Sequence, residues 1–241
     1  SNNKTKLMNG GIYFFKKKIF DYVLNKKTSL ENDILDELIK RKKIKGIYSN
    51  NRFIDIGSIK NLNLLKKNPN FISQRAVFLD RDGVINKLNP DGYILDFNQF
   101  KLLPGVGNAI NFLNKNNYLV IVVTNQACVG KSIITENKLH KIHEKMKKKI
   151  FKNNQGLIND IYCSPYYKYS KNKKYRINSI DRKPNPGMIL KAVKKWNLSI
   201  NDSFFIGDSI SDYNAAKKIG LKFYYKNNEL FDKQIKRIVG K

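Results

Sequence analysis

The chain has 241 residues, a formal net charge of +28, and 41% hydrophobic and 12% aromatic residues. This apolar content suffices for a buried core, which excludes a wholly disordered chain, and no apolar run approaches the roughly 18 residues of a membrane-spanning helix. The N-terminus lacks the basic-then-apolar pattern of a signal peptide. Two cysteines, Cys128 and Cys163, cannot build a disulfide framework, so we expect a cytoplasmic protein without a membrane partner.

The basic excess has two readings. A positively charged groove binds phosphate backbones, so the net charge suggests nucleic acid as a partner. However, only seven of the 47 basic residues are arginine, and the lysines run through every segment, mixed with asparagine and isoleucine. Nucleic-acid surfaces rely on arginine and interleaved aromatic residues. A genome-wide drift toward Lys, Asn and Ile codons produces the same composition, and we therefore do not expect a nucleic-acid partner.

In chain order, the first boundary is a turn-like cluster at 67–70, which separates a segment 1–70 from a domain 71–241. Beyond it, short apolar runs alternate with segments of helical spacing. Such alternation implies an α/β fold, a parallel sheet with helices on both faces. The predicted strands are 76–79, 118–123, 158–163, 203–206 and 221–225, and the predicted helices are 106–113, 139–150, 186–196 and 213–219.

Polar residues follow several of these strands, where sites in open parallel sheets lie. Three carboxylates that share one crevice repel each other unless a cation sits among them, and oxygen ligands favour Mg²⁺. A lysine and a threonine hydroxyl supply positive charge and a donor for a phosphoryl oxygen. The groups are Asp80-Arg81-Asp82-Gly83, Thr124-Asn125-Gln126, Lys183 before Pro184, and Gly207-Asp208 with Asp212.

These four groups resemble the four motifs of the haloacid dehalogenase (HAD) phosphatases. Within that superfamily, they are most similar to the branch that holds the heptose bisphosphate phosphatases and the histidinol-phosphatases. The resemblance covers about residues 75–225. It implies a HAD-like (Rossmannoid) sheet. Only 41 positions separate Gly83 from Thr124, and 59 separate Thr124 from Lys183, so we expect no large cap domain.

The resemblance also implies the role of each motif residue. Asp80 is the expected nucleophile, which forms an aspartyl-phosphate, and Asp82 the expected general acid and base. The expected Mg²⁺ ligands are Asp80, Asp208 and the main-chain carbonyl of Asp82. Thr124 and Lys183 are expected to hold the phosphoryl oxygens, with Asp212 orienting its neighbours. The expected substrate-binding residues are Asn125, Gln126, Lys131 and Arg182.

The sequence departs from this branch in the loop before Arg182. The heptose phosphatases typically carry four zinc ligands there, as a Cys-x-His and a Cys-x-Cys. Here Cys163 has no such partner, and Ser179 and Asp181 replace the second pair. A structural zinc needs about four ligands, so we expect none. His140 and His143 are predicted to be solvated or packing residues, and the loop 166–180 is predicted to pack through its aromatic residues or to be mobile.

Residues 4–68 resemble the C-terminal part of a sugar-1-phosphate nucleotidylyltransferase. The matching motifs are Asn9-Gly10-Gly11, Ser29-Leu30-Glu31-Asn32-Asp33 and Arg52-Phe53-Ile54-Asp55. The family's glycine-rich loop is absent from this chain, so we expect no nucleotide transfer by the segment alone. Either an upstream nucleotidylyltransferase portion of a longer chain is the expected partner, or the segment is a relic that packs on the phosphatase.

Taken together, the motifs predict an Mg²⁺-dependent phosphatase that removes the 7-phosphate of a heptose 1,7-bisphosphate, a small phosphorylated sugar. The presence of a nucleotidylyltransferase-like segment and a phosphatase-like domain in one chain favours this substrate. A heptose-1-phosphate guanylyltransferase acts next in making an activated heptose. Histidinol-phosphatase and polynucleotide 3′-phosphatase remain alternative enzymes. A basic module that binds phosphosugars or anchors a partner, without catalysis, remains the alternative outside enzymes.

Overall fold

The computed structural model describes residues 9–22, 28–47, 55–67, 73–90 and 92–240. The chain divides into two compact units, Ser1–Asn61 and Leu62–Lys241. The boundary expected near residue 70 lies outside the described residues, as do residues 52–54 of the N-terminal motif.

The smaller unit is built from short helical turns. It contains a 3₁₀ turn η1 (Lys17–Tyr22), a π-helical turn η2 (Leu30–Leu35) and α1 (Asp36–Lys40). Ser29 caps η2, because its hydroxyl accepts the N–H of Asn32. Ile34, Leu35 and Leu38 are buried. The helix α2 (Ile59–Lys67) spans the division between the units.

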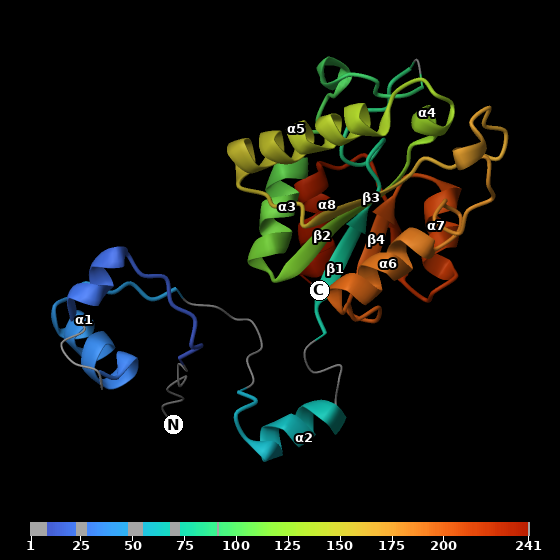
Figure 1. The fold of residues 1–241 in the computed structure, drawn as a ribbon. Helices are drawn as coiled ribbons and strands as arrows, with labels where there is room; N and C mark the ends of the chain where they lie inside the picture. The colour runs from blue at the N-terminus through green and yellow to red at the C-terminus, as the bar shows by residue number, and fades with distance from the viewer. Residues whose placement is uncertain (1–8, 23–27, 48–54, 68–72, 91, 241) are drawn as a thin grey trace. The chain divides into compact units, whose positions relative to one another are not determined.

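The larger unit contains a five-stranded parallel sheet (Figure 1). The strands are β1 (Arg75–Leu79), β2 (Tyr118–Asn125), β3 (Asp160–Ser164), β4 (Phe204–Gly207) and β5 (Lys222–Tyr225), in the order β3-β2-β1-β4-β5. In register, Leu79 lies beside Val122 and Ile206. The predicted α/β class is confirmed, and each predicted strand forms within two residues of its expected start and end.

Alternate residues of the strands face two helical layers, as the period of a strand requires. Val77 and Leu79 belong to a core under α3 (Val106–Lys115), α5 (Glu136–Asn154) and α8 (Phe231–Val239). Ala76 and Phe78 belong to the core under α6 (Gly187–Trp196) and α7 (Ile210–Lys217). The two cores explain why the strands are apolar at consecutive positions.

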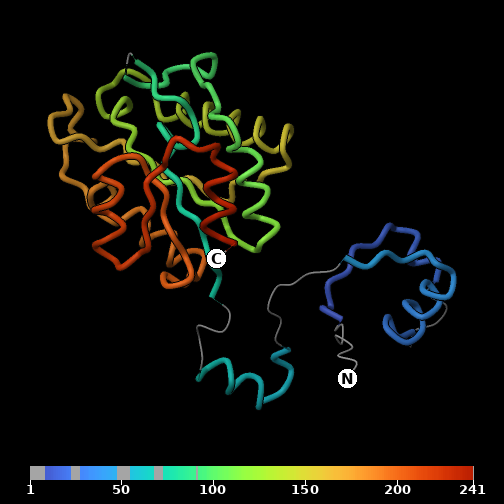
Figure 2. The backbone as a smooth tube through the Cα atoms, turned by 180° about the vertical axis from the view of Figure 1, so that it is seen from behind, coloured from blue at the N-terminus to red at the C-terminus, as the bar shows by residue number. Residues whose placement is uncertain are grey.

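The sequence analysis missed the C-terminal helix α8, as well as helices α1, α2 and α4 (Ala127–Gly130). Helix α8 packs beside α3, as the view from behind shows (Figure 2). Only Phe231 and Ile235, one turn apart, are fully buried apolar residues on it. Ile238 and Val239 are partly buried against the same core, so the four apolar residues follow the spacing i, i+4, i+7 and i+8 of an amphipathic helix, a signal that the sequence analysis overlooked.

Loops and short turns occupy the edge of the sheet where the strands end. Residues 83–105 follow β1 and include the turn η4 (Phe97–Gln99), α4 (Ala127–Gly130) follows β2, and η5 (Lys173–Tyr175) lies in the loop after β3. The described residues form no cap domain over this edge. None of their helices is long and apolar enough to cross a membrane.

Candidate active site

Asp80 lies directly after β1, at the centre of the sheet. Its Oδ1 accepts the backbone N–H of Arg81 at 2.7 Å and lies 2.9 Å from Lys183 Nζ. Lys183 is 3% exposed, and its Nζ also contacts Asp212 Oδ1 at 2.6 Å and the carbonyl of Val123 at 2.8 Å. These three acceptors match the three donors of an ammonium group. The lysine therefore bridges two carboxylates and the end of β2.

Burial dominates the protonation of Asp80. Burial raises the pKa of this carboxyl, the Lys183 charge lowers it, and the Asp212 charge raises it again. The net result is a pKa of about 6. For Lys183, burial lowers the pKa, and the Asp80 and Asp212 carboxylates more than offset that effect, so the pKa is raised. One ammonium group thus contacts two buried carboxylates, and at Asp80 it does not fully offset the effect of burial on the pKa.

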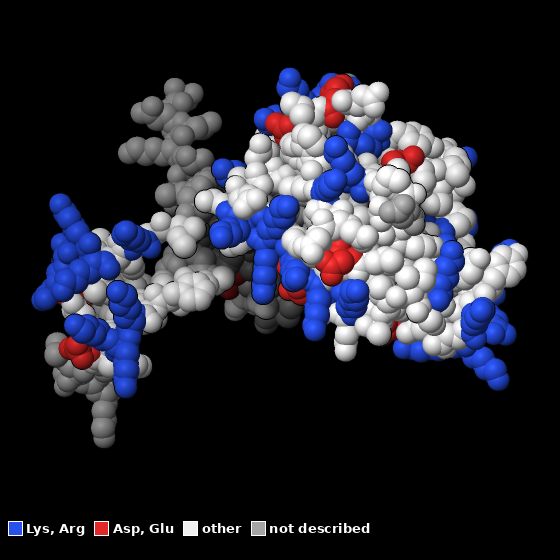
Figure 3. All heavy atoms as spheres, turned by 90° about the horizontal axis from the view of Figure 1, so that it is seen from above, with Lys and Arg blue, Asp and Glu red and all other residues white. Residues whose placement is uncertain are grey.

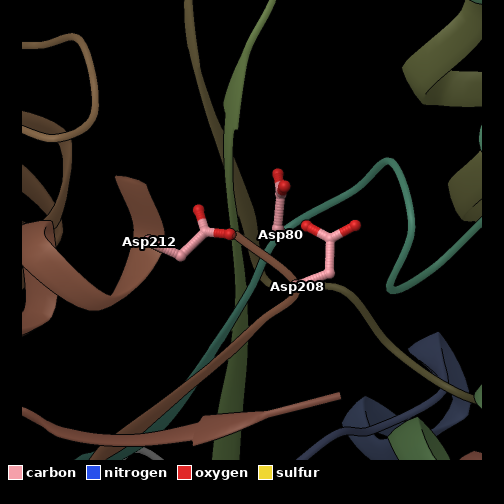
Figure 4. A group of neighbouring side chains, drawn as sticks. All are labelled: Asp80, Asp208 and Asp212. Carbon is pink, nitrogen blue, oxygen red and sulfur yellow. The ribbon is translucent and has the colours of Figure 1, made fainter. Parts of the chain in front are cut away.

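Asp80, Asp208 and Asp212 converge beyond the ends of β1 and β4 (Figure 4), with one oxygen of each within 4.8 Å of the others. Asp208 keeps part of its surface exposed. Partial burial of its carboxyl and the Asp212 charge raise its pKa. Gly83, at φ +84°, makes room for this carboxylate, because a Cβ there would lie 1.8 Å from Asp208 Oδ2. Mutually repelling oxygen ligands of this kind fit a hard divalent cation.

Asp212 is already committed to protein partners. It is fully buried, and besides its contact with Lys183 its Oδ2 accepts the N–H of Ser209 at 3.1 Å and the Ser209 hydroxyl at 2.7 Å. Ser209 in turn caps α7. The carboxylates with room for a metal ion are therefore Asp80 and Asp208, and Asp212 holds Lys183 in place.

Asp82, two residues after Asp80, has very different surroundings. Its carboxylate accepts hydrogen bonds from Arg81 at 2.9–3.1 Å, Asn86 at 2.9 Å and Gln126 at 2.8 Å. Burial acts to raise the pKa of Asp82, but the charge of Arg81 and the hydrogen bonds from Asn86 and Gln126 outweigh it, so the pKa is lowered. The side chain keeps 26% of its surface exposed and remains accessible.

His143, on α5, contacts this network from the helical layer. Its Nε2 lies 3.1 Å from Arg81 Nη1, and the imidazole is 5% exposed. Burial and the Arg81 charge lower its pKa to about 3. The sequence analysis predicted a solvated or packing residue without a role. The available signal was its position on the buried face with Leu139 and Met146, where a polar side chain needs a polar partner.

The three residues after Val123 form hydrogen bonds with other residues of the site. Thr124 is 1% exposed and its hydroxyl accepts Gln126 Nε2 at 2.9 Å. The amide of Asn125 bonds both backbone groups of Lys183, at 3.0 and 3.1 Å. Gln126 has no exposed surface and also accepts Arg81 Nη2 at 3.0 Å. This differs from the predicted substrate contact of Gln126, because a fully enclosed amide positions its protein neighbours.

The other two expected substrate residues lie in loops at the same edge of the sheet. Lys131 is exposed, with its Nζ 5.3 Å from the ring centre of Tyr93 and 4.9 Å from that of Tyr167. Burial lowers the pKa of Arg182, and the same two tyrosines oppose this shift. Arg182 Nη1 donates to the carbonyl of Tyr166 at 2.8 Å. We call Lys131, Arg182, Tyr93 and Tyr167 the basic rim.

The loop after β3 is held by packing and hydrogen bonds. Tyr175 belongs to the core, and its hydroxyl donates to Glu136 at 2.7 Å. Ser170 donates to the carbonyl of Gly130, and Arg176 Nε donates to that of Ser170 at 2.6 Å. The predicted aromatic packing of this loop is therefore confirmed. Cys163 is a free thiol at its start.

Comparison with known proteins gives these features a context. The haloacid dehalogenase-like hydrolase family matches residues 7–220. The chain is 36% identical over 165 residues to D-glycero-beta-D-manno-heptose-1,7-bisphosphate 7-phosphatase of Rhodopseudomonas palustris, which covers 68% of this chain and 89% of that protein. It is 36% identical over 150 residues to D-glycero-alpha-D-manno-heptose-1,7-bisphosphate 7-phosphatase of Burkholderia mallei. That match covers 62% of this chain and 78% of the relative.

A solved structure shares the fold. D,D-heptose 1,7-bisphosphate phosphatase from B. bronchiseptica, complexed with magnesium and phosphate, aligns with a TM-score of 0.58 at 21% identity, over 69% of this chain and 98% of that one. The match of the family over most of the chain agrees with the parallel sheet and with the residues found at its strand ends. This chain belongs to the haloacid dehalogenase-like hydrolases.

Proposed function

We propose that this hydrolase is a phosphatase that removes the 7-phosphate from D-glycero-D-manno-heptose 1,7-bisphosphate, in the synthesis of a nucleotide-activated heptose. The observation that carries the proposal is the buried contact of 2.9 Å between Asp80 and Lys183, beside Asp208, in a chain whose relatives are heptose bisphosphate phosphatases. It supports a site in which Asp80 is the nucleophile, Lys183 the cation for phosphoryl oxygens and Asp208 a metal-binding carboxylate.

The reaction would proceed in two displacements at phosphorus. In the first, an Asp80 oxygen forms a bond to phosphorus while the bond to the sugar oxygen breaks, and Asp82 gives that oxygen a proton. In the second, Asp82 takes a proton from water, whose oxygen attacks phosphorus, and the bond to Asp80 breaks. Inorganic phosphate leaves, and both carboxyl groups return to their starting states.

Asp80, Asp208 and the main-chain carbonyl of Asp82 are the proposed ligands of Mg²⁺. The ion, when bound, offsets negative charge on the transferring group. Lys183 is proposed to hold a phosphoryl oxygen, because any group at Asp80 Oδ1 lies beside its ammonium. Thr124, at the end of β2, is proposed as a second contact for these oxygens.

The basic rim is proposed to bind the phosphate that is not removed. A guanidinium grips phosphate with two parallel hydrogen bonds, and Arg182 directly follows the loop that carries Tyr166 and Tyr167. The carboxylates considered as partners of Arg182 have other contacts, since Asp181 pairs with Lys191 and Asp202 with Ser199. Among the described residues, the guanidinium therefore bonds one backbone carbonyl and keeps free donors.

The test is phosphate release from a panel of substrates. It contains both anomers of the heptose 1,7-bisphosphate, histidinol phosphate and a 3′-phosphorylated oligonucleotide, and phosphorus NMR of the product identifies the phosphate that is lost. Selective loss of the 7-phosphate supports the proposal. Faster release from histidinol phosphate or from the oligonucleotide would replace it with one of those activities, and no release from any substrate would favour a binding module.

The charge distribution makes the oligonucleotide the weaker candidate. On the face shown in Figure 3, lysine and arginine side chains are scattered over the larger unit and form no single continuous band. A phosphate-tracking groove gives a steep dependence of binding on salt, with a slope of about −0.7 per phosphate contact on single strands. Binding of single-stranded DNA in a salt titration checks this directly.

The similarity of residues 4–68 to a nucleotidylyltransferase fragment is a further part of the proposal. Asp55, expected near a metal in that family, uses its Oδ1 to accept the N–H of Gly57 at 2.8 Å. A carboxylate occupied with its own turn agrees with a segment that does not transfer nucleotides by itself. Incubation of the protein with GTP and a heptose 1-phosphate should therefore release no pyrophosphate.

A further inference from the structure

The guanidinium of Arg81 is enclosed between the active site and the helical layer. Its side chain has no exposed surface, although it immediately follows the nucleophile in the sequence. Nε and Nη2 donate to the Asp82 carboxylate at 2.9–3.1 Å, and Nη2 also donates to Gln126 Oε1 at 3.0 Å. One edge of the guanidinium therefore holds the carboxylate, and the opposite edge faces α5.

His143 occupies that opposite edge. Its Nε2 lies 3.1 Å from Arg81 Nη1, and an arginine only donates hydrogen bonds, so the imidazole nitrogen accepts. Residues on both sides of His143 along α5, Ile142 and Met146, are buried in the core, so the helix fixes the position of the ring. The acceptor is thus held by the packing of α5, and it contacts the guanidinium on the edge away from Asp82.

We propose that His143 and Arg81 are positioning residues that hold the Asp82 carboxylate where it meets the leaving oxygen. The proposal rests on the proposed phosphatase function. A general acid works only within hydrogen-bond distance of the oxygen that it protonates, and a small displacement lowers the rate strongly. Gln126, at the start of α4, joins the network, because its Nε2 donates to both Asp82 and Thr124.

The dependence of the rate on the leaving group distinguishes this role from a purely structural one. A sugar alkoxide is a poor leaving group and needs a proton, whereas 4-nitrophenolate leaves without one. The parameter kcat/KM reports the steps up to the first irreversible one, which includes departure of the leaving group. A misplaced Asp82 must therefore slow the sugar phosphate more than 4-nitrophenyl phosphate.

The experiment measures kcat/KM on both substrates for His143→Leu and His143→Gln. Removing the acceptor in His143→Leu should lower the value for the sugar phosphate about tenfold or more and that for 4-nitrophenyl phosphate less than twofold. His143→Gln should recover most of the lost kcat/KM on the sugar phosphate, because its amide oxygen can accept a hydrogen bond from Arg81. The matched control is His140→Gln, one turn away on the exposed side of α5, which should change neither value.

A double variant tests whether the effect passes through Asp82. In the Asp82→Asn background, His143→Leu should no longer change the ratio of the two kcat/KM values, because the group that it positions is gone. If His143→Leu does not fold, Arg81→Lys carries the same test, since lysine keeps the charge and loses the paired donors.

Equal losses on both substrates, no loss on either, or the same change of ratio with and without the Asp82 carboxyl would overturn the proposal. The outcome is separable from that of the proposed function. If the wild-type protein does not hydrolyse the heptose bisphosphate, the same comparison is made between any alkyl phosphate that it does hydrolyse and 4-nitrophenyl phosphate.

Discussion

Asp80 and Asp82 lie two residues apart on one loop, and their surroundings shift their pKa values in opposite directions. Asp80 shares the ammonium of Lys183 with Asp212, and burial raises its pKa to about 6. Asp82 has most of the Arg81 guanidinium to itself, with two amide donors, and its pKa is lowered. The number of donors for each carboxylate, and not their common burial, decides the difference.

Both shifts are opposite to what the proposed reaction needs. A nucleophile must be ionised and a general acid must carry a proton. A cation bound at Asp80 and Asp208 favours the ionised nucleophile, and a phosphate dianion near Asp82 favours its protonated form. On the proposed mechanism, binding of metal and substrate would therefore bring each carboxyl into its working state.

The largest expected effect comes from replacing the proposed nucleophile, Asp80. Asp80→Asn keeps the shape of the side chain and removes the attacking oxygen, so steady-state phosphate release should vanish. Circular dichroism should show an unchanged fold, and Asp202→Asn, a carboxyl outside the site, should behave as wild type. Release by Asp80→Asn within tenfold of the wild-type rate would contradict the covalent mechanism.

Removal of the metal should affect the nucleophile nearly as strongly. Activity should disappear on exhaustive chelation and return with Mg²⁺, because the Asp80 and Asp208 carboxylates repel each other and the phosphate without a cation. Ca²⁺ should bind and inhibit, since its longer bonds and higher coordination misplace the nucleophile. Full activity in the chelated protein would show that the carboxylate cluster does not need a metal.

Breaking the acid–base side should have a smaller effect. Asp82→Asn leaves the nucleophile intact but slows both displacements, and a general acid and base contributes about 10²–10⁴-fold. Rapid-quench kinetics should show slow formation and slow hydrolysis of the aspartyl-phosphate. An effect confined to one of the two steps would mean that Asp82 does not serve as both acid and base.

Arg182→Ala tests a cation outside both neighbourhoods. We expect KM for the bisphosphate to rise by a factor that corresponds to about 1.5–3 kcal/mol, the usual value of a charged hydrogen bond. A monophosphate substrate should hardly be affected, because it offers no second phosphate. The matched control is Arg75→Ala, since Arg75 lies at the opposite end of β1. Equal losses on both substrates would show that Arg182 supports the site in general.

The smallest effect concerns stability. Burial and Asp212 raise the pKa of Asp208, so its ionised form destabilises the metal-free fold. Asp208→Asn should raise the Tm of metal-free protein at pH 7 by about 2 °C. The gain is full above the raised pKa and fades as the pH falls through it toward the ordinary value of an aspartate. Calorimetry at pH 7 and pH 4 measures the gain in Tm at each pH. A larger gain at pH 4 than at pH 7 would contradict the raised pKa of Asp208.

Patterns in the sequence are enough to predict the parallel sheet and the motifs at its strand ends. Apolar runs predict strands because each strand is buried on both sides, and the polar residues that follow them must meet at one edge. This reasoning places Asp80, Thr124 and Asp208 together before any distance is known. Lys183, which lies just before α6, is assigned its role in the site through the family resemblance. The sequence analysis also missed α8, although the four apolar residues of that helix show helical spacing in the sequence, and the packing against α3 makes that face evident.

The tertiary structure alone decided which partner each polar side chain takes. Arg81 and His143 are 62 positions apart in the sequence, and they meet because α5 packs over the face of the sheet to which Leu79 and Arg81 point. Asn125 binds the backbone of Lys183 for the same kind of reason. A hydrogen bond depends on distances of a few tenths of an ångström, which residue order does not encode and which helix packing sets.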